Sequence, residues 1–198
     1  ARALIKGKSV SATPKGAEYD YSNFRGLVIL VEFTDRKFSR TNANEIFSDL
    51  VSKKDFKGVP KVDNPEEVEP YTGSVRDYFY DNSMGKFDPE FDVVGPFEID
   101  YTSTSMMDNG NLSNTTMAAV ISAIVSAAND TVDFSQYDRD GDGYVDMFYI
   151  IFAGFGSNYY GNNAGYIWPH QGYQYKRVDG VYTQKYACST EFYGYEST

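Results

Sequence analysis

The sequence predicts an α/β fold, in which helices cover a twisted, mostly parallel mixed sheet. Residues 27–33 and 145–152 form two largely apolar, β-rich runs, which are typical of strands covered on both faces. Residues 117–128 form the strongest helical segment and are apolar almost all round, which predicts a largely buried helix. Because predicted helices alternate with these central strands, an α/β sheet is favoured over separate helical and sheet layers.

The chain divides into a polar leader or linker, residues 1–24, and one domain, residues 25–198. After the first strand, Thr41 is the predicted cap of a helix. The apolar side chains of that helix fall on one side, at Ile46, Phe47, Leu50 and Val51. Residues 52–70 are charged, contain proline and lack a clear period, so we expect a surface loop there.

Ser74 and Asp77 resemble a capping box, with Asp in place of the usual Glu, and predict a helix that closes at Gly85. Residues 91–99 read as a strand, but Gly95-Pro96 interrupts it and predicts an edge strand or a bend. Residues 101–116 are rich in Ser, Thr and Asn and predict a loop. Near the end of the chain we expect a hairpin, with its turn at residues 178–180 and its return strand at 181–187.

The most informative motif places carboxylates at alternate positions with glycines between them. Asp138, Asp140 and Asp142 match loop positions one, three and five of the EF-hand pattern, Tyr144 would offer its backbone carbonyl, and Asp146 matches position nine. Such a tight loop directs its negative charges toward one point, where a cation must neutralise them. Calcium suits the site because it accepts six to eight oxygen ligands at flexible angles.

The loop departs from the EF-hand in two ways. Tyr149 stands at position twelve, where a bidentate Glu belongs, and the segment leads into a strand and not a helix. We therefore predict a structural calcium loop in strand context, whose missing carboxylate comes from elsewhere, with Asp130 and Asp133 as candidates. The alternative is a solvated acidic turn that holds no ion.

Composition excludes several classes of protein. The formal net charge of −10 argues against a nucleic-acid partner and suits a secreted or cell-surface protein that tolerates calcium. Aromatic residues make up 17 % of the chain, which is too many for a disordered protein. No apolar run approaches the ~18 residues that span a membrane. The single Cys188 cannot form an internal disulfide.

An ordered series of segments resembles the secreted immune-inhibitor-A-like zinc metalloproteases over roughly residues 26–195. The series comprises residues 26–35 (GLVILVEFTD), 73–79 (GSVRDYF), 82–87 (NSMGKF), 91–96 (FDVVGP), 133–138 (DFSQYD), the Asp-rich loop, Ala153-Gly154 and 167–170 (IWPH). The resemblance implies a zincin-like N-terminal subdomain, a protein or peptide substrate and zinc in the parent enzyme. The family's H-E-x-x-H helix, in which two histidines hold zinc and Glu activates water, does not occur here, because the chain has one histidine. The resemblance thus predicts the upstream half of a catalytic domain, inactive alone, with its zinc ligands in a downstream segment.

Other residues keep two interpretations each. His170 is either a structural, cleft-lining residue or a ligand, and Glu191 is a hydrogen-bonding or second-calcium carboxylate or else a base. Cys188 is either an inert buried thiol or a nucleophile, which would need His170 as its base. Residues 162–170 form either a sheet edge that pairs with a peptide, as the resemblance implies, or an exposed loop. A non-catalytic, calcium-stapled extracellular binding module is the alternative function.

Overall fold

A computed structural model of the chain describes residues 21, 24–61, 64, 66–104, 107–108, 111–112, 114–157 and 167–192. The predicted leader or linker, residues 1–24, lies almost wholly outside the described residues. In chain order the elements are β1 (Arg25–Phe33), α1 (Ala43–Ser52), β2 (Gly58–Pro60), β3 (Val68–Pro70), α2 (Val75–Asn82), β4 (Glu90–Ile99), β5 (Met107–Asp108), β6 (Asn111–Leu112), α3 (Asn114–Ala128), the 3-10 helix η1 (Phe134–Tyr137), β7 (Phe148–Phe155), β8 (His170–Val178) and β9 (Val181–Phe192).

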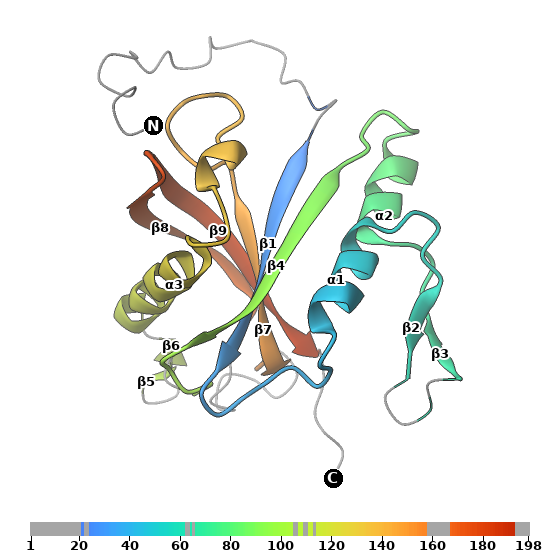
Figure 1. Ribbon diagram of the computed structural model, residues 1–198, viewed down its shortest axis with the longest axis horizontal. Coiled ribbons are helices and arrows are strands. Elements are labelled where there is room, and N and C mark those ends of the chain that lie inside the picture. The colour runs from blue at the N-terminus through green and yellow to red at the C-terminus, as the bar shows by residue number, and fades with distance from the viewer. Residues whose placement is uncertain are drawn as a thin grey trace.

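The centre of the molecule is a five-stranded sheet in the order β4-β1-β7-β9-β8. β1 runs parallel to both β4 and β7, β7 runs parallel to β9, and only the edge strand β8 is antiparallel to its neighbour. Figure 1 shows the strands twisting across one another, with α3 on one side and α1 and α2 on the other. This arrangement confirms the predicted α/β class and the mostly parallel mixed sheet.

The alternation of side chains along β1 divides the core into two layers. Leu27, Ile29 and Phe33 point into the larger layer, which α3 covers with Val120, Ile121, Ile124 and Val125. The neighbours Val28 and Leu30 point into the smaller layer, which α1 closes with Ala43 and Phe47. Because both faces of β1 are buried, its sequence is apolar without a break from Leu27 to Val31, as the prediction of a central strand requires.

α3 confirms the predicted buried helix, although it begins at Asn114, three residues before the expected start at Met117. Met117, Val120, Ile121, Ile124, Val125 and Ala128 are all buried. The predicted loop at residues 101–116 is wrong in part, since it also contains the two-residue strands β5 and β6. Strands this short cannot display a period in the sequence.

The segment between β1 and β4 differs most from the prediction. Asn42, and not Thr41, is the N-cap residue of α1, and its side chain makes no capping hydrogen bond. The predicted surface loop at residues 52–70 contains the antiparallel ribbon of β2 and β3. A Cβ atom at Gly58 would lie 2.0 Å from the carbonyl oxygen of Glu69, so only glycine lets the ribbon close.

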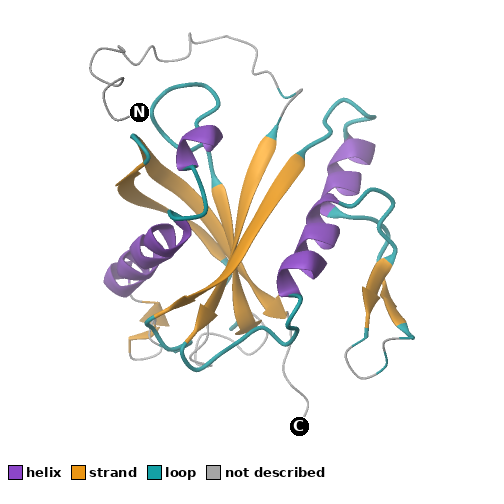
Figure 2. Cartoon of the chain, viewed as in Figure 1, coloured by secondary structure: helices purple, strands orange, loops and turns teal. Residues whose placement is uncertain are grey.

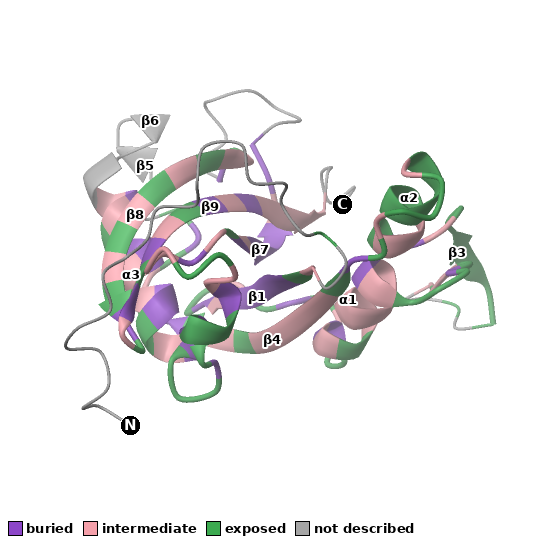
Figure 3. Cartoon of the chain, turned by 90° about the horizontal axis from the view of Figure 1, so that it is seen from above, coloured by how far each residue is buried: buried purple, intermediate pink, exposed green. Residues whose placement is uncertain are grey.

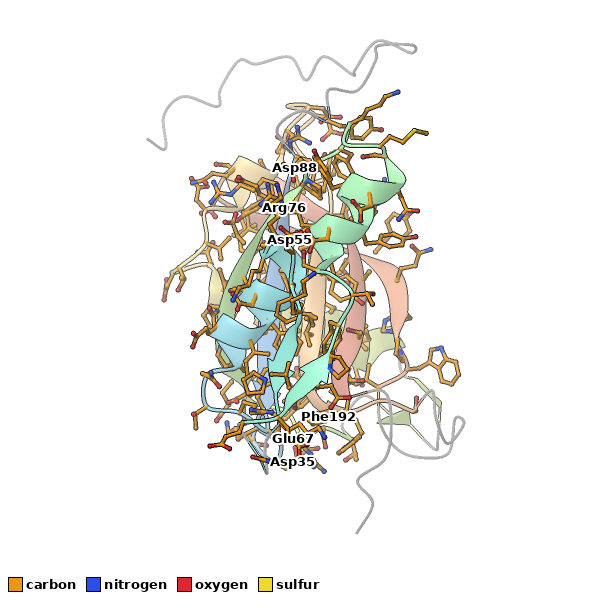
Figure 4. All side chains as sticks on the ribbon, turned by 90° about the vertical axis from the view of Figure 1, so that its right-hand side faces the viewer. Asp35, Asp55, Glu67, Arg76, Asp88 and Phe192 are labelled. Atoms are coloured by element: carbon orange, nitrogen blue, oxygen red, sulfur yellow. The ribbon has the colours of Figure 1, made fainter. Side chains whose placement is uncertain are left out.

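α2 confirms the predicted capping box, because Asp77 donates its N–H to Ser74 Oγ and accepts the N–H of Ser74 in return. The helix ends at Asn82, and none of its own residues is buried. Arg76 forms a bidentate pair with Asp88, which ties α2 to the start of β4. Figure 4 shows this pair at one end of the molecule, with Asp35 and Phe192 at the other.

The structure confirms the remaining predicted strands and changes some of their bounds. β4 is an edge strand, and its register with β1 shifts between Ile29 and Val31, close to Gly95. The predicted hairpin is present, with Asp179 and Gly180 both at positive φ in its turn. β9 extends to Phe192, five residues beyond the expected end at Ala187. β7 starts at Phe148, because residues 145–147 still belong to the approach from the Asp-rich loop.

Candidate metal centre

The Asp-rich loop, residues 138–146, joins η1 to the approach to β7 (Figure 2). Its closing end is fixed by backbone hydrogen bonds to two other elements. The N–H of Asp146 donates to the carbonyl of Tyr137 at 2.9 Å, which closes the loop on η1. Gly143 and Val145 exchange hydrogen bonds with Tyr182 at the start of β9, each 2.9 Å long. The loop is therefore held between η1 and the sheet.

Three carboxylates of the loop converge. One oxygen each of Asp138, Asp140 and Asp142 lies within 4.8 Å of the other two, and within the described residues this is the one such group of three or more His, Cys, Asp or Glu side chains. Gly141 and Gly143 have φ values of +73° and +88°, a conformation that glycine adopts without steric cost. The glycines between the aspartates therefore let the backbone turn its carboxylates inward.

Backbone N–H groups of the loop donate to several of these oxygens. The N–H of Gly143 donates to Asp138 Oδ2 at 3.0 Å, and the N–H groups of Asp142 and Tyr144 donate to Asp140 Oδ1 and Asp142 Oδ1 at 3.1 and 2.8 Å. Asp138 Oδ1 is buried and has no hydrogen-bond partner. An unpaired buried carboxylate oxygen is costly, so the loop leaves a position that a cation would satisfy.

The pKa of Asp138 is raised above its ordinary value. Burial is the largest cause, and the negative charges of Asp142 and Asp140 add to it. Desolvation and like charge therefore disfavour the charged form of Asp138 in the loop. The three groups that converge are carboxylates, which are the hard oxygen ligands that calcium prefers.

The other carboxylates that the sequence analysis considered are not part of the three-carboxylate group. The side chain of Asp146 lies outside it. Asp133 accepts hydrogen bonds from the N–H and hydroxyl of Ser135 as the cap of η1, which lowers its pKa. Asp130 is exposed in the turn before η1. Among the described residues, no fourth His, Cys, Asp or Glu side chain joins the group in the place of the twelfth-position carboxylate.

His170 lies in a hydrogen-bonded cluster on the side of the sheet that α3 covers. Its Nδ1 lies 2.7 Å from the carbonyl oxygen of Trp168, so Nδ1 carries the proton, and its Nε2 accepts from the hydroxyl of Tyr186 at 3.0 Å. Cys188 Sγ lies 3.2 Å from the same Nδ1. Burial raises the pKa of Cys188 to about 11. A protonated nitrogen cannot take the thiol's proton, so this geometry matches the inert interpretation of Cys188 and the structural one of His170.

Glu191 joins three segments. Its Oε1 accepts from the N–H and the hydroxyl of Ser39, at 2.9 and 2.5 Å, and its Oε2 accepts from the N–H of Gly154 at 3.0 Å. Both oxygens are engaged, so Glu191 is the hydrogen-bonding carboxylate of the two interpretations. It fixes the loop after β1 and the end of β7 to β9.

The sequence analysis missed a row of exposed tyrosines beside the loop. Tyr144 contacts Tyr175 and Tyr182, with ring centroids 6.4 and 6.0 Å apart. The sequence offered one signal, because Tyr173 and Tyr175 stand two positions apart before the predicted hairpin turn and so fall on one face of a strand.

No protein-family model matches this chain, and no curated protein matches it. None of the described helices has both the length and the apolar character needed to span a membrane.

Proposed function

We propose that this chain is a calcium-stapled scaffold: the upstream part of a secreted zinc endopeptidase domain, in which Asp138, Asp140 and Asp142 hold a structural calcium ion. The observation that carries the calcium part is the convergence of the three carboxylates around the unpaired, buried Asp138 Oδ1. The ion would neutralise the loop between η1 and β7 and stabilise the folded sheet by mass action.

Zinc does not fit the residues of this chain. A catalytic zinc needs three protein ligands, usually with two or more histidines among them. The chain has only His170, whose two nitrogens are already engaged by Trp168 and Tyr186. The proposal therefore places the zinc ligands in a downstream segment of the parent protein.

Two features of the fold support the scaffold part of the proposal. The sheet is mostly parallel with a single antiparallel edge strand and is covered by helices, as the family resemblance implies. The edge strand is β8, which begins at His170, so its outer side offers the backbone groups with which an extended peptide substrate pairs. Of the segment that the sequence analysis singled out for this edge, residues 162–166 lie outside the described residues.

The calcium site is tested by thermal unfolding of the wild type and Asp140→Ala, in calcium and in EDTA. At calcium about 100-fold above its Kd, the wild type should gain about 2.7 kcal/mol, or roughly 5–10 °C in Tm. Asp140→Ala should lose this shift, whereas Asp81→Ala on α2 should keep it. If Asp140→Ala keeps the calcium-induced shift in Tm, the assignment of the calcium site is wrong.

The peptidase part is tested on the parent protein by intact mass and by zinc and calcium content. We expect one zinc, bound by a segment outside these residues, and calcium-dependent stability. Purified alone, the chain should cleave no casein and bind no stoichiometric zinc. Zinc-dependent cleavage by the isolated chain would contradict the division of labour that we propose.

A calcium-stapled binding module is the second candidate, and one observation favours it. Tyr173, Tyr175 and Tyr182 are 65 %, 57 % and 43 % exposed on a single stretch of the sheet. Exposed aromatic side chains that gather in this way mark interaction surfaces. A parent protein that lacks zinc and peptidase activity but retains the calcium shift would favour this candidate.

A further inference from the structure

The exposed side chains of β8 and β9 form a surface of unusual composition. They are Gln171, Tyr173, Tyr175, Arg177, Tyr182 and Lys185, and we call them the tyrosine face. Figure 3 shows exposed positions alternating along β8, with α3 on one side of the sheet. Tyr173 pairs with Lys185 and Arg177 pairs with Tyr182 across the two strands, so these side chains share a side.

The tyrosine face lies on the side of the sheet away from α3. Lys176, the neighbour of Tyr175 and Arg177, points the other way and donates to the carbonyl of Ser122 on α3 at 2.7 Å. Gln174 likewise reaches the hydroxyl of Ser122. Since successive side chains of a strand point to opposite faces, their neighbours in β8 face outward.

The charge of this surface is opposite to that of the whole chain. The formal net charge of the chain is −10, yet the exposed charged residues of β8 and β9 are the cations Arg177 and Lys185, with no carboxylate among them. A local positive surface on an acidic protein attracts acidic partners and orients them during encounter. Tyrosine and arginine are also the residues that dominate binding energy at protein interfaces.

The Asp-rich loop borders the tyrosine face directly. The ring of Tyr144 stands against the rings of Tyr175 and Tyr182, and the backbone of Tyr144 forms a β-bridge with Tyr182. The three converging carboxylates therefore belong to the same short loop as Tyr144, a residue that packs against the face. Without a cation they place negative charge beside it, and a bound calcium ion would offset most of that charge.

We infer that the tyrosine face docks an acidic polypeptide segment and that calcium in the Asp-rich loop strengthens the docking. The calcium dependence rests on the proposed calcium site. Tyr173, Tyr175 and Tyr182 supply rigid apolar area with a polar hydroxyl, while Arg177 and Lys185 pair with carboxylates of the partner. Two cations are too few for a polyphosphate or polysulfate chain, whose affinity depends on many ionic contacts. A polypeptide with separated carboxylates fits this surface better.

The inference is tested by fluorescence anisotropy with a labelled random copolymer of glutamate and tyrosine. The double variant Arg177→Glu/Lys185→Glu should weaken binding by about tenfold or more, since it places like charges opposite each other. The matched control Lys54→Glu/Lys57→Glu changes the net charge equally at exposed positions outside the face and should change binding less than about threefold. Tyr175→Ser should weaken binding without altering charge.

The same samples separate the two proposals. Calcium should tighten copolymer binding by several-fold relative to EDTA, and the calcium-induced Tm shift is recorded in parallel. A normal Tm shift with no copolymer binding, or with equal losses in the two double variants, overturns the docking inference and leaves the calcium site intact. Copolymer binding without any Tm shift supports docking and refutes its calcium dependence together with the calcium site. Tighter binding of heparin or of an oligothymidylate than of the copolymer overturns the choice of a polypeptide.

Discussion

Two carboxylates, Asp77 in the first turn of α2 and Asp138 at the start of the Asp-rich loop, have opposite electrostatic environments. Asp77 accepts three backbone N–H groups, from Ser74 at 2.9 Å, Asp55 at 3.1 Å and Phe56 at 3.2 Å. These hydrogen bonds, led by that of Ser74, lower the pKa of Asp77. Asp138 has one buried oxygen without a partner and two aspartates close by, and its pKa is raised.

The difference shows that the supply of donors, and not the number of acidic residues, separates a structural carboxylate from a candidate cation ligand. Backbone N–H groups satisfy Asp77, so no ion is needed there. The same holds for Glu191, whose two oxygens accept three hydrogen bonds. In the Asp-rich loop the buried Asp138 Oδ1 has no hydrogen-bond partner, so an external positive charge would satisfy it.

The largest expected effect is that of Asp77→Ala. The substitution removes the carboxylate half of the capping box, and it leaves the N–H groups of Ser74, Asp55 and Phe56 without their acceptor. We expect a loss of about 2–4 kcal/mol in the free energy of unfolding, the same in calcium and in EDTA. Urea denaturation measures it, with Asp81→Ala on the exposed side of α2 as the control. A loss that calcium restores would mean that Asp77 and the Asp-rich loop are not independent.

Asp138→Asn should have a smaller effect of opposite sign in EDTA. Asn keeps an oxygen for the N–H of Gly143 but removes one charge from the cluster, so we expect a gain of about 0.5–1 kcal/mol, the low range reflecting solvent screening. In calcium the order should reverse, because the wild type gains from the ion and the variant does not. Asp130→Asn, in the nearby turn, should change neither value. A variant that is less stable than the wild type in EDTA would show that repulsion does not govern the loop.

Local features of this contrast were predictable from the sequence, and long-range features were not. The capping box of Ser74 and Asp77 and the convergence of Asp138, Asp140 and Asp142 depend on residues within a few positions, so spacing alone reveals them. The apolar run of β1 likewise predicts a strand that is buried on both faces.

Contacts between segments that are distant in the sequence could not be predicted from a single sequence. Glu191 meets Ser39 across 152 positions, and His170 meets Cys188 only because β8 and β9 pair in one particular register. The exact N-cap position of α1 could not be predicted either. Thr41 and Asn42 are both good N-cap residues by type, and in the structure Asn42 occupies the position. The same limit hid the contact of Tyr144 with Tyr175 and Tyr182.

The smallest expected effect is a difference in acid sensitivity between the wild type and Asp77→Asn in EDTA. Because the pKa of Asp77 is lowered in the folded protein, its charge contributes stability that is fully present above the unfolded value of about 3.9 and disappears as the pH falls through the folded pKa. Asp138, with a raised pKa, acts in the opposite direction, since folding becomes less costly as it takes up a proton. The free energy of unfolding, measured in urea from pH 7 to pH 3, should therefore differ between the wild type and Asp77→Asn by a constant of about 0.5 kcal/mol down to pH 5, a small value because solvent screens this partly exposed carboxylate. The difference should shrink below that pH, because protonation makes the wild-type side chain as neutral as asparagine.

Asp138→Asn should show the reverse pH dependence: it should be more stable than the wild type at neutral pH in EDTA, and this advantage should fade as acid neutralises the loop.

The test is the sign of the two changes. If the stability differences of Asp77→Asn and Asp138→Asn from the wild type change with pH in the same direction, the two carboxylates do not differ in the way that their hydrogen bonds indicate.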